Sequence, residues 1–151
     1  MKYIGKIIHL FISEKGNKHR LAKKTLTLDK KGILKDKFYA KDINRSVLIT
    51  TVESYSLALK HDISMPFGTL GENLLVDYNL YHLPNNTKLQ IGQNVLIEIS
   101  QPCTMCDHLS KIDKKLPKLL KKDRGIFAKV IQGGTIQEGD KVYLLDNIQG
   151  E

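Results

Sequence analysis

The chain has 151 residues, of which 41% are hydrophobic and 26% charged, and its formal net charge is +8. This size and composition indicate one soluble domain over residues 1–151, and no apolar run reaches the roughly 20 residues that a membrane span needs. The N-terminal residues carry lysine inside an apolar stretch and lack a small-residue cleavage site, so they do not predict a signal peptide. We therefore expect a cytoplasmic protein with no membrane partner.

The positive charge is concentrated in two stretches, residues 15–24 and 111–124. Basic surfaces attract nucleic acid, anionic membranes or anionic ligands. The four phenylalanines and six tyrosines do not interleave with lysine and arginine, as a stacking platform for single-stranded nucleic acid requires. Nucleic acid is therefore not the favoured partner. Two interpretations of the positive charge stay open: lysine-rich faces that are simply solvated, and a surface that binds an anion.

The first half of the chain alternates short strands with turns. A turn is predicted at 30–32, and β-branched and apolar runs predict strands at 3–12, 25–28, 47–49 and 74–76. The sequence Thr-Thr-Val-Glu at 50–53 is a capping-box pattern, which predicts a helix over residues 52–60. Val52, Tyr55 and Leu59 would lie on one face of this helix.

The second half continues the pattern of short elements. A hairpin is predicted from strands 88–91 and 95–100, joined by a Gly-Gln-Asn turn. Residues 110–121 have apolar residues at helical spacing, and Pro117 inside them predicts two short helices or a kink. Further strands are expected at 125–132 and 141–145. Many short strands with a few short helices predict a mainly β fold, a closed or nearly closed β-barrel.

Both cysteines of the chain lie in one turn, within "SQPCTMCDHLSK" at residues 100–111. A structural zinc site needs four ligands, of which this pair supplies two, and the five histidines are scattered. Haem attachment is excluded because Asp107, not histidine, follows Cys106. A redox-active dithiol fits the local strand-then-helix order, although the chain lacks βαβ alternation. Two further interpretations of the pair stay open. Both cysteines could be packing residues, or one thiolate could bind a soft metal whose other ligands come from a cofactor.

Five segments in order resemble the MOSC domains, the molybdenum-cofactor-sulfurase C-terminal family. They are "GILKDKF" (32–38), "NRSVLITTVES" (44–54), "FGTLGENLLV" (67–76), "IEISQPCTMCDHL" (97–109) and "RGIFAKVIQGGTIQEGDKV" (124–142). Each segment alone is a weak signal, but their common order and spacing cover most of the chain. The resemblance implies a closed β-barrel with short peripheral helices and the binding of a molybdenum cofactor, molybdopterin.

The resemblance also implies which residues form the site. The family's key cysteine matches Cys106, which would be the molybdenum ligand and the catalytic residue, whereas Cys103 matches a variable position. Other cofactor-binding candidates in matching segments are Arg45, Glu72, Asn73, Thr104 and Arg124. Arginine suits the anionic group of the pterin, and the amide, carboxyl and hydroxyl groups suit its polar edge. Surface ion pairs and turn hydrogen bonds are the structural alternatives for these residues.

The chain departs from the family pattern at three positions. In the segment that resembles "GI.GD.H", Lys35 stands for the glycine and Phe38 for the histidine. Met105 stands where a proline commonly precedes the second cysteine. If the histidine takes part in the chemistry of relatives, then in this chain its role is either absent or filled by another residue.

Three functions stay open at this point. Small stand-alone relatives include hydroxylaminopurine-resistance reductases, which remove oxygen from N-hydroxylated compounds. A reductase of this kind would need an external electron donor protein, because the chain shows no flavin, haem or iron–sulfur motif. The alternatives are a carrier or maturation protein for the cofactor, and a basic binding module without a cofactor. The sequence does not indicate the oligomeric state.

Overall fold

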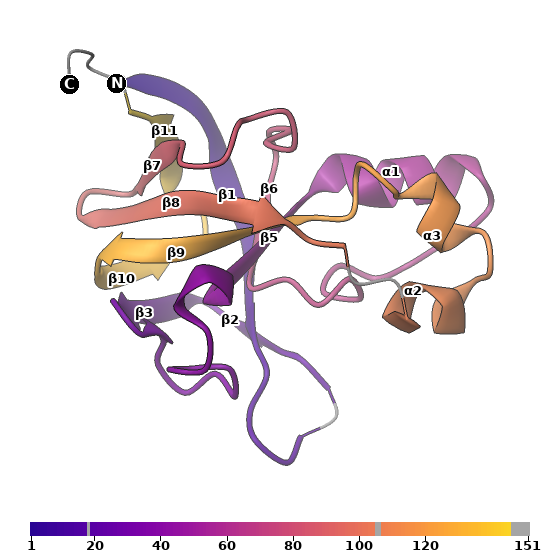
Figure 1. The fold of residues 1–151 in the computed structure, drawn as a ribbon, viewed down its shortest axis with the longest axis horizontal. Coiled ribbons are helices and arrows are strands. Elements are labelled where there is room, and N and C mark those ends of the chain that lie inside the picture. The colour runs from indigo at the N-terminus through magenta and orange to yellow at the C-terminus, as the bar shows by residue number, and fades with distance from the viewer. Residues whose placement is uncertain (18, 105–106, 146–151) are drawn as a thin grey trace.

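The computed structural model describes residues 1–17, 19–104 and 107–145, and its centre is a closed barrel of β-strands (Figure 1). The strands follow one another around the barrel in the order β11-β7-β8-β9-β5-β6-β1, and a β1–β11 pairing closes it. They are β1 (Lys2–Ile12), β5 (Val47–Thr51), β6 (Leu74–Val76), β7 (Lys88–Ile91), β8 (Val95–Pro102), β9 (Ile126–Gln132) and β11 (Lys141–Leu144). The predicted mainly β, closed-barrel fold is confirmed.

Short strands extend the barrel at one end. β2 (Leu21–Lys23) pairs with the end of β1. A separate three-stranded sheet has the order β10-β3-β4, from β10 (Gly134–Gln137), β3 (Thr25–Asp29) and β4 (Gly32–Ile33). The turns that follow β4 bring residues 43–45 against the strands β8 and β9, just before the chain enters β5.

The helices gather on one side of the barrel, at the right of Figure 1. They are α1 (Val52–Lys60), α2 (Asp107–Ile112) and α3 (Leu116–Leu119), and a 3-10 helix η1 (Ile43–Arg45) precedes β5. Pro117 lies in the first turn of α3, where its missing N–H costs no helical hydrogen bond, so the predicted division into two short helices is confirmed. None of the helices in the described ranges has the length and apolar character to cross a membrane.

Two apolar cores lie on opposite sides of the barrel wall. Inside the barrel, alternate residues such as Val47 and Ile49 of β5 and Leu74 of β6 are at most 1% exposed. Outside it, Tyr55 and Ala58 of α1 pack with Leu75 and with residues of α2 and α3. The strands of the wall therefore bury both of their faces, and the outer face carries the helices.

The predicted helix over residues 52–60 is confirmed as α1, but its predicted capping box is wrong. The N-cap residue Thr51 makes no side-chain capping bond, and its N–H instead donates to the Tyr81 hydroxyl at 2.9 Å. Glu53, the expected second half of the capping box, accepts a hydrogen bond from Asn79. Val52, Tyr55 and Leu59 lie on one face of α1, where they border the same cavity. The helix packs through Tyr55 and Ala58, whereas Leu59 is 61% exposed.

Candidate functional site

The cysteine turn begins where β8 leaves the barrel. Cys103 is 2% exposed, and its N–H donates to the carbonyl of Gly125 at 2.9 Å. Its side chain packs with Leu48 of β5 and Phe127 of β9 in a small cluster on the outer side of the wall. Cys106, the predicted molybdenum ligand, lies outside the described residues. We call the group of Cys103, Leu48 and Phe127 the cysteine cluster.

Two predicted arginines approach the cysteine cluster from different segments. The guanidinium of Arg45 lies over the Phe127 ring, 5.1 Å from its centroid. Arg124 is only 6% exposed and directly precedes Gly125. Gly125 has φ +150°, and a Cβ there would lie 3.2 Å from both the Ile49 carbonyl oxygen and the Leu48 side chain. The glycine therefore lets the start of β9, and with it Arg124, pack closely against β5.

A third arginine, Arg20, was not predicted as a site residue. Its Nη1 donates to the carbonyl of Glu72 at 3.0 Å, although 52 residues separate the two in sequence. Burial lowers the pKa of Arg20, while the carboxylates of Asp36 and Glu72 act in the opposite direction and the nearby charge of Arg124 lowers it further. Arg20 thus shares one electrostatic neighbourhood with Glu72 and Arg124. Its only sequence signal was membership of a basic stretch, which does not reveal a tertiary contact.

Glu72 is a fully buried carboxyl group with one oxygen satisfied and one not. Its Oε2 accepts hydrogen bonds from the Tyr55 hydroxyl at 2.7 Å and from the Gly68 N–H at 3.2 Å. Within the described ranges, its Oε1 has no hydrogen-bond partner. Burial and the neighbouring Glu72 carboxylate raise the pKa of Tyr55, so the phenol stays a proton donor. An unsatisfied buried carboxylate oxygen is costly in a folded protein, so its retention calls for an explanation such as a catalytic role or a bound ion.

Asn73 has its side chain engaged with the protein. Its Oδ1 accepts from the Leu48 N–H at 3.0 Å, and its Nδ2 donates to the Phe11 carbonyl at 3.2 Å. Asp36 lies beside it, 5% exposed, with its Oδ1 accepting from the Ser13 N–H at 2.8 Å. Asn73 therefore ties β1 and β5 together next to Glu72. A direct cofactor contact of Asn73 stays a prediction, as does one of Thr104, which is exposed on the cysteine turn.

Two of the three departures from the family pattern lie in described residues, and they have different structural consequences, whereas the third, Met105, lies outside these residues. Lys35, in place of the glycine, has φ +73°, the left-handed conformation that glycine adopts at little cost. Phe38, in place of the histidine, is 49% exposed, and its backbone N–H donates to Asp36 Oδ2 at 3.1 Å. Lys35 thus adopts a backbone conformation suited to the family's glycine, while the phenylalanine at position 38 cannot transfer a proton.

A cavity of about 290 Å³ opens beside the cysteine cluster. Its lining includes Cys103, Tyr81 and three cationic side chains, those of Lys121, Lys122 and Arg124. Such a lining suits an anionic ligand. We call this cavity the cationic pocket.

A hydrogen-bond chain holds the loop that supplies the cations. The Ser54 hydroxyl donates to the Asp123 carbonyl, and the Tyr81 hydroxyl lies 2.7 Å from the Ser54 Oγ. Burial raises the pKa of Tyr81 to about 12, so its O–H remains protonated at neutral pH. These two hydrogen bonds therefore hold residues 121–124 against the start of α1.

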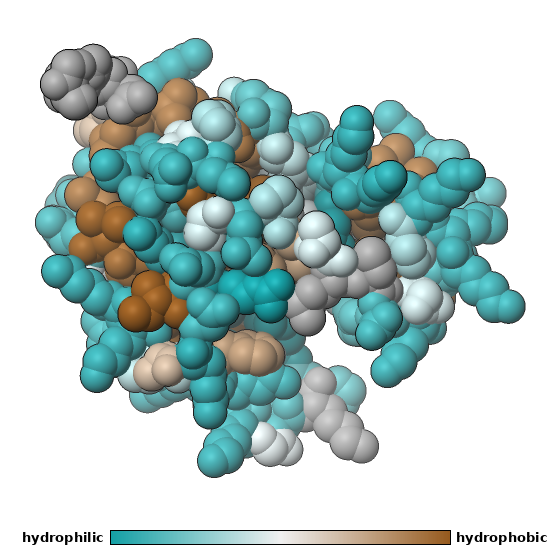
Figure 2. Space-filling view, in the orientation of Figure 1, coloured by the Kyte–Doolittle hydropathy of each residue, from teal (hydrophilic) through white to brown (hydrophobic). Residues whose placement is uncertain are grey.

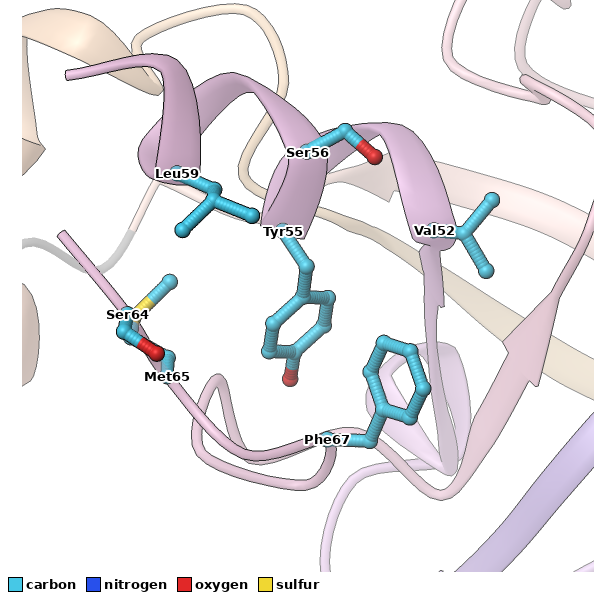
Figure 3. A pocket seen from close by; sticks show the side chains of 7 residues that line it. All are labelled: Val52, Tyr55, Ser56, Leu59, Ser64, Met65 and Phe67. Carbon is cyan, nitrogen blue, oxygen red and sulfur yellow. The ribbon is translucent and has the colours of Figure 1, made fainter. Parts of the chain in front are cut away.

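A second cavity, of about 220 Å³, lies between α1 and residues 64–67 (Figure 3). Tyr55 and Phe67 meet there edge to face, with ring centroids 5.1 Å apart, and the Tyr55 hydroxyl points toward the segment below the helix (Figure 3). The other lining residues are Val52, Ser56, Leu59, Ser64 and Met65. No charged side chain lines this cavity, so it suits neither a metal nor an anion.

The described residues contain no cluster of three or more histidine, cysteine or acidic side chains that could hold a metal ion. A metal at this site would therefore need some of its ligands from a bound cofactor. A single thiolate next to a cofactor that carries its own donor atoms meets that condition.

Comparisons with known proteins agree with this architecture. The MOSC domain family model matches residues 23–143. The YuaD protein from Bacillus subtilis superposes with a TM-score of 0.78 at 17% identity, covering 94% of this chain and 97% of that one. YiiM from Escherichia coli superposes with a TM-score of 0.71 at 18% identity, over 99% of this chain and 72% of that one. YiiM from Geobacillus stearothermophilus superposes with a TM-score of 0.66 at 14% identity, covering 97% of this chain and 75% of that one. No curated protein sequence matches the chain significantly.

Proposed function

Since the chain belongs to the MOSC domain family, which is associated with molybdenum cofactor binding, we propose that it binds molybdopterin beside the cysteine cluster and reduces N-hydroxylated compounds. Cys106 would be the protein ligand of molybdenum. Cys106 follows Cys103 by three positions in the same turn. The observations that support the proposal therefore come from Cys103 and the residues around it.

The observation that carries the proposal is the Oε1 of Glu72, which is buried close to Arg20 and has no hydrogen-bond partner among the described residues. A pterin ring presents N–H groups, and a buried carboxylate oxygen without a partner is an acceptor suited to them. The cofactor also carries an anionic phosphate or nucleotide group, for which the guanidinium groups of Arg45 and Arg124 and the cationic pocket are suited. The residues present therefore fit the cofactor.

When bound, the cofactor supplies a two-electron redox centre that can accept an oxygen atom. In the overall reaction the N–O bond of the substrate breaks, and two electrons and two protons convert the N-hydroxyl compound to its amine and water. The electrons come from an external donor protein. The residues of this chain would bind and orient the cofactor. Arg20, Arg45 and Arg124 supply positive charge for it. The packed side chains of Leu48, Cys103 and Phe127 exclude water from the barrel wall behind the cysteine turn.

The roles of individual residues follow from their contacts. Glu72 would accept a cofactor N–H while the Tyr55 hydroxyl holds its other oxygen in place. Arg20, through its bond to the Glu72 carbonyl, would position this residue without contacting the cofactor. Because no side chain at position 38 can transfer a proton, protons would reach the substrate from water at the exposed mouth of the site.

The proposal is tested by turnover of 6-N-hydroxylaminopurine by protein purified from a host that makes the cofactor, with dithionite as reductant. We expect the amine as product, formed in proportion to bound molybdenum. Cofactor-loaded protein that forms neither the amine from hydroxylaminopurine nor the amidine from an amidoxime would contradict the reductase function and favour a carrier.

The role of Glu72 has a matched test. Glu72→Gln keeps an oxygen for Tyr55 and Gly68 but places an amide nitrogen, a donor, at the Oε1 position. We expect less cofactor per chain than in Glu53→Gln, which changes an exposed carboxyl group of α1. Equal cofactor content in the two variants would remove Glu72 from the site.

A further inference from the structure

Much of the positive charge of the protein lies on the second of its two basic stretches. Residues 111–122 contain six lysines and a single acidic residue, Asp113, and therefore supply +5 of the formal net charge of +8. The six are Lys111, Lys114, Lys115, Lys118, Lys121 and Lys122, and we call them the lysine face. A lysine-rich composition alone would spread this charge along the chain, so its concentration needs a local explanation.

The packing of α2 and α3 directs all six lysines outward. Leu109, Leu116 and Leu120 are at most 1% exposed and pack against α1, so the intervening lysines point into solvent. Figure 2 shows hydrophilic residues over most of this lobe, at the right of the view where Figure 1 places α2 and α3. The carboxylate of Asp113 accepts the Lys115 backbone N–H at 2.8 Å, a local turn contact.

Several lysines elsewhere have partners that the lysine face lacks. Lys88 and Lys129 both lie within 4.0 Å of Glu98, and Lys141 lies over the Tyr3 ring. In the part of the chain that the structure describes, no ion pair joins any lysine of the lysine face to a carboxylate. These ammonium groups are therefore available to carboxylates from outside.

The lysine face borders the candidate site. Lys121 and Lys122 line the cationic pocket together with Cys103, and the Ser54–Asp123 hydrogen bond holds their loop in place. A macromolecule seated on the lysine face would therefore lie at the mouth of the pocket. This is the position that a protein delivering electrons to the site must occupy.

We propose that the lysine face is the docking surface for the electron donor protein, and that the donor presents an acidic surface to it. The inference rests on the proposed reductase function, which requires electrons from outside the chain. Charge complementarity of this kind speeds encounter and fixes orientation while allowing rapid release. Residues 107–124 contain no Phe, Tyr or Trp, so the lysine face lacks the stacking side chains that single-stranded nucleic acid uses.

The test uses charge reversal on the part of the face that does not line the pocket. The triple variant Lys114→Glu, Lys115→Glu, Lys118→Glu is compared with Lys30→Glu, Lys31→Glu, Lys41→Glu, which makes the same charge change at exposed positions of another region. The probe is an acidic ferredoxin, and its Kd is measured by titration calorimetry at several salt concentrations. We expect the first triple to weaken binding by at least about tenfold and to flatten the salt dependence, and the control to change Kd much less.

Turnover separates failure of this inference from failure of the proposed function. With dithionite as reductant, the first triple should reduce 6-N-hydroxylaminopurine at the wild-type rate, whereas with reduced ferredoxin its rate should fall in parallel with binding. Loss of all turnover in wild-type protein with dithionite would count against the proposed function, and the binding titrations would still decide the docking surface. Wild-type affinity in the first triple, or tighter binding of duplex DNA than of ferredoxin by the wild type, overturns the inference.

Discussion

The two faces of β5 show how differently the barrel interior and the site are built. Val47 and Ile49 point inward into a core of aliphatic side chains, whereas Leu48 points outward to Cys103 and Phe127. Beside the outward face lies a group of polar residues with specific hydrogen bonds, which we call the wall cluster: Arg20, Asp36, Tyr55, Glu72 and Asn73. The interior depends on apolar volume and the wall cluster on matched donors and acceptors.

This difference teaches where stability and function reside. An aliphatic core accepts many sequences of similar volume, so it constrains the chain only loosely. A buried polar network loses stability when any single member is removed, because its partners are left without hydrogen bonds in a low-dielectric environment. Such a network is worth retaining where it also fixes the geometry of a site.

Removal of interior volume should give the largest loss of stability. Leu74 is fully buried in the barrel, so we expect Leu74→Ala to lower the free energy of unfolding by about 2–5 kcal/mol. Urea denaturation measures the change. Leu59→Ala, at a 61% exposed position, is the control and should stay within about 0.5 kcal/mol of wild type. A comparable loss in both variants would contradict the assigned core.

Removal of one hydroxyl from the wall cluster should cost less but act more specifically. The Tyr55 hydroxyl donates to Glu72 Oε2 and accepts the Gly68 and Leu70 N–H groups at 3.1 Å each. We expect Tyr55→Phe to lower the free energy of unfolding by about 1–3 kcal/mol and to reduce cofactor content per folded chain. Tyr3→Phe, at an exposed position, is the matched control. Unchanged stability in Tyr55→Phe would show that the network does not contribute.

The site segment should be open to stabilisation at Lys35. Its φ of +73° disfavours any residue with a Cβ, so we expect Lys35→Gly to raise the free energy of unfolding by about 0.5–1 kcal/mol. Lys37→Gly makes the same change two residues on, where the structure records no positive φ, and should lower stability instead. Thermal denaturation of the two variants compares them directly, and equal shifts would contradict the strained conformation.

The last expected effect is confined to alkaline pH. The pKa of Tyr81 is about 12 in the folded protein, against about 10 for an unfolded tyrosine. Between these values the unfolded chain releases the proton while the folded protein keeps it, so stability is complete below pH 10 and falls as pH rises toward 12. Tyr81→Phe should flatten this fall in urea titrations at pH 9 to 12. An identical pH profile in wild type and variant would contradict the raised pKa.

The sequence predicted the interior better than the wall cluster. The β-branched and apolar run at 3–12 and the hairpin turn between 88–91 and 95–100 indicated barrel strands, and Pro117 indicated the division of the last helices, since these signals are local. The strands β2, β4 and β10, with 3, 2 and 4 residues, are too short to show a period. The capping box failed because Tyr81, 30 residues away, supplies the partner of Thr51.

The site itself was only partly predictable. The family segments pointed to Arg45, Glu72 and Arg124, and the structure brings Glu72 and Arg124 near the same guanidinium. That guanidinium belongs to Arg20, which no local motif distinguishes from its basic neighbours. Contacts between residues far apart in sequence depend on the closure of the barrel, and a local pattern cannot encode them.

The most direct test of the central claim is the molybdenum and pterin content per chain of protein from a host that makes the cofactor. The comparison is between the wild type, Cys106→Ala and the neighbouring control Cys103→Ala. Near-stoichiometric metal and pterin in the wild type, loss of metal in Cys106→Ala and its retention in Cys103→Ala are the predicted result. Absence of both from the wild type, or equal metal in wild type and Cys106→Ala, would contradict molybdenum binding through Cys106.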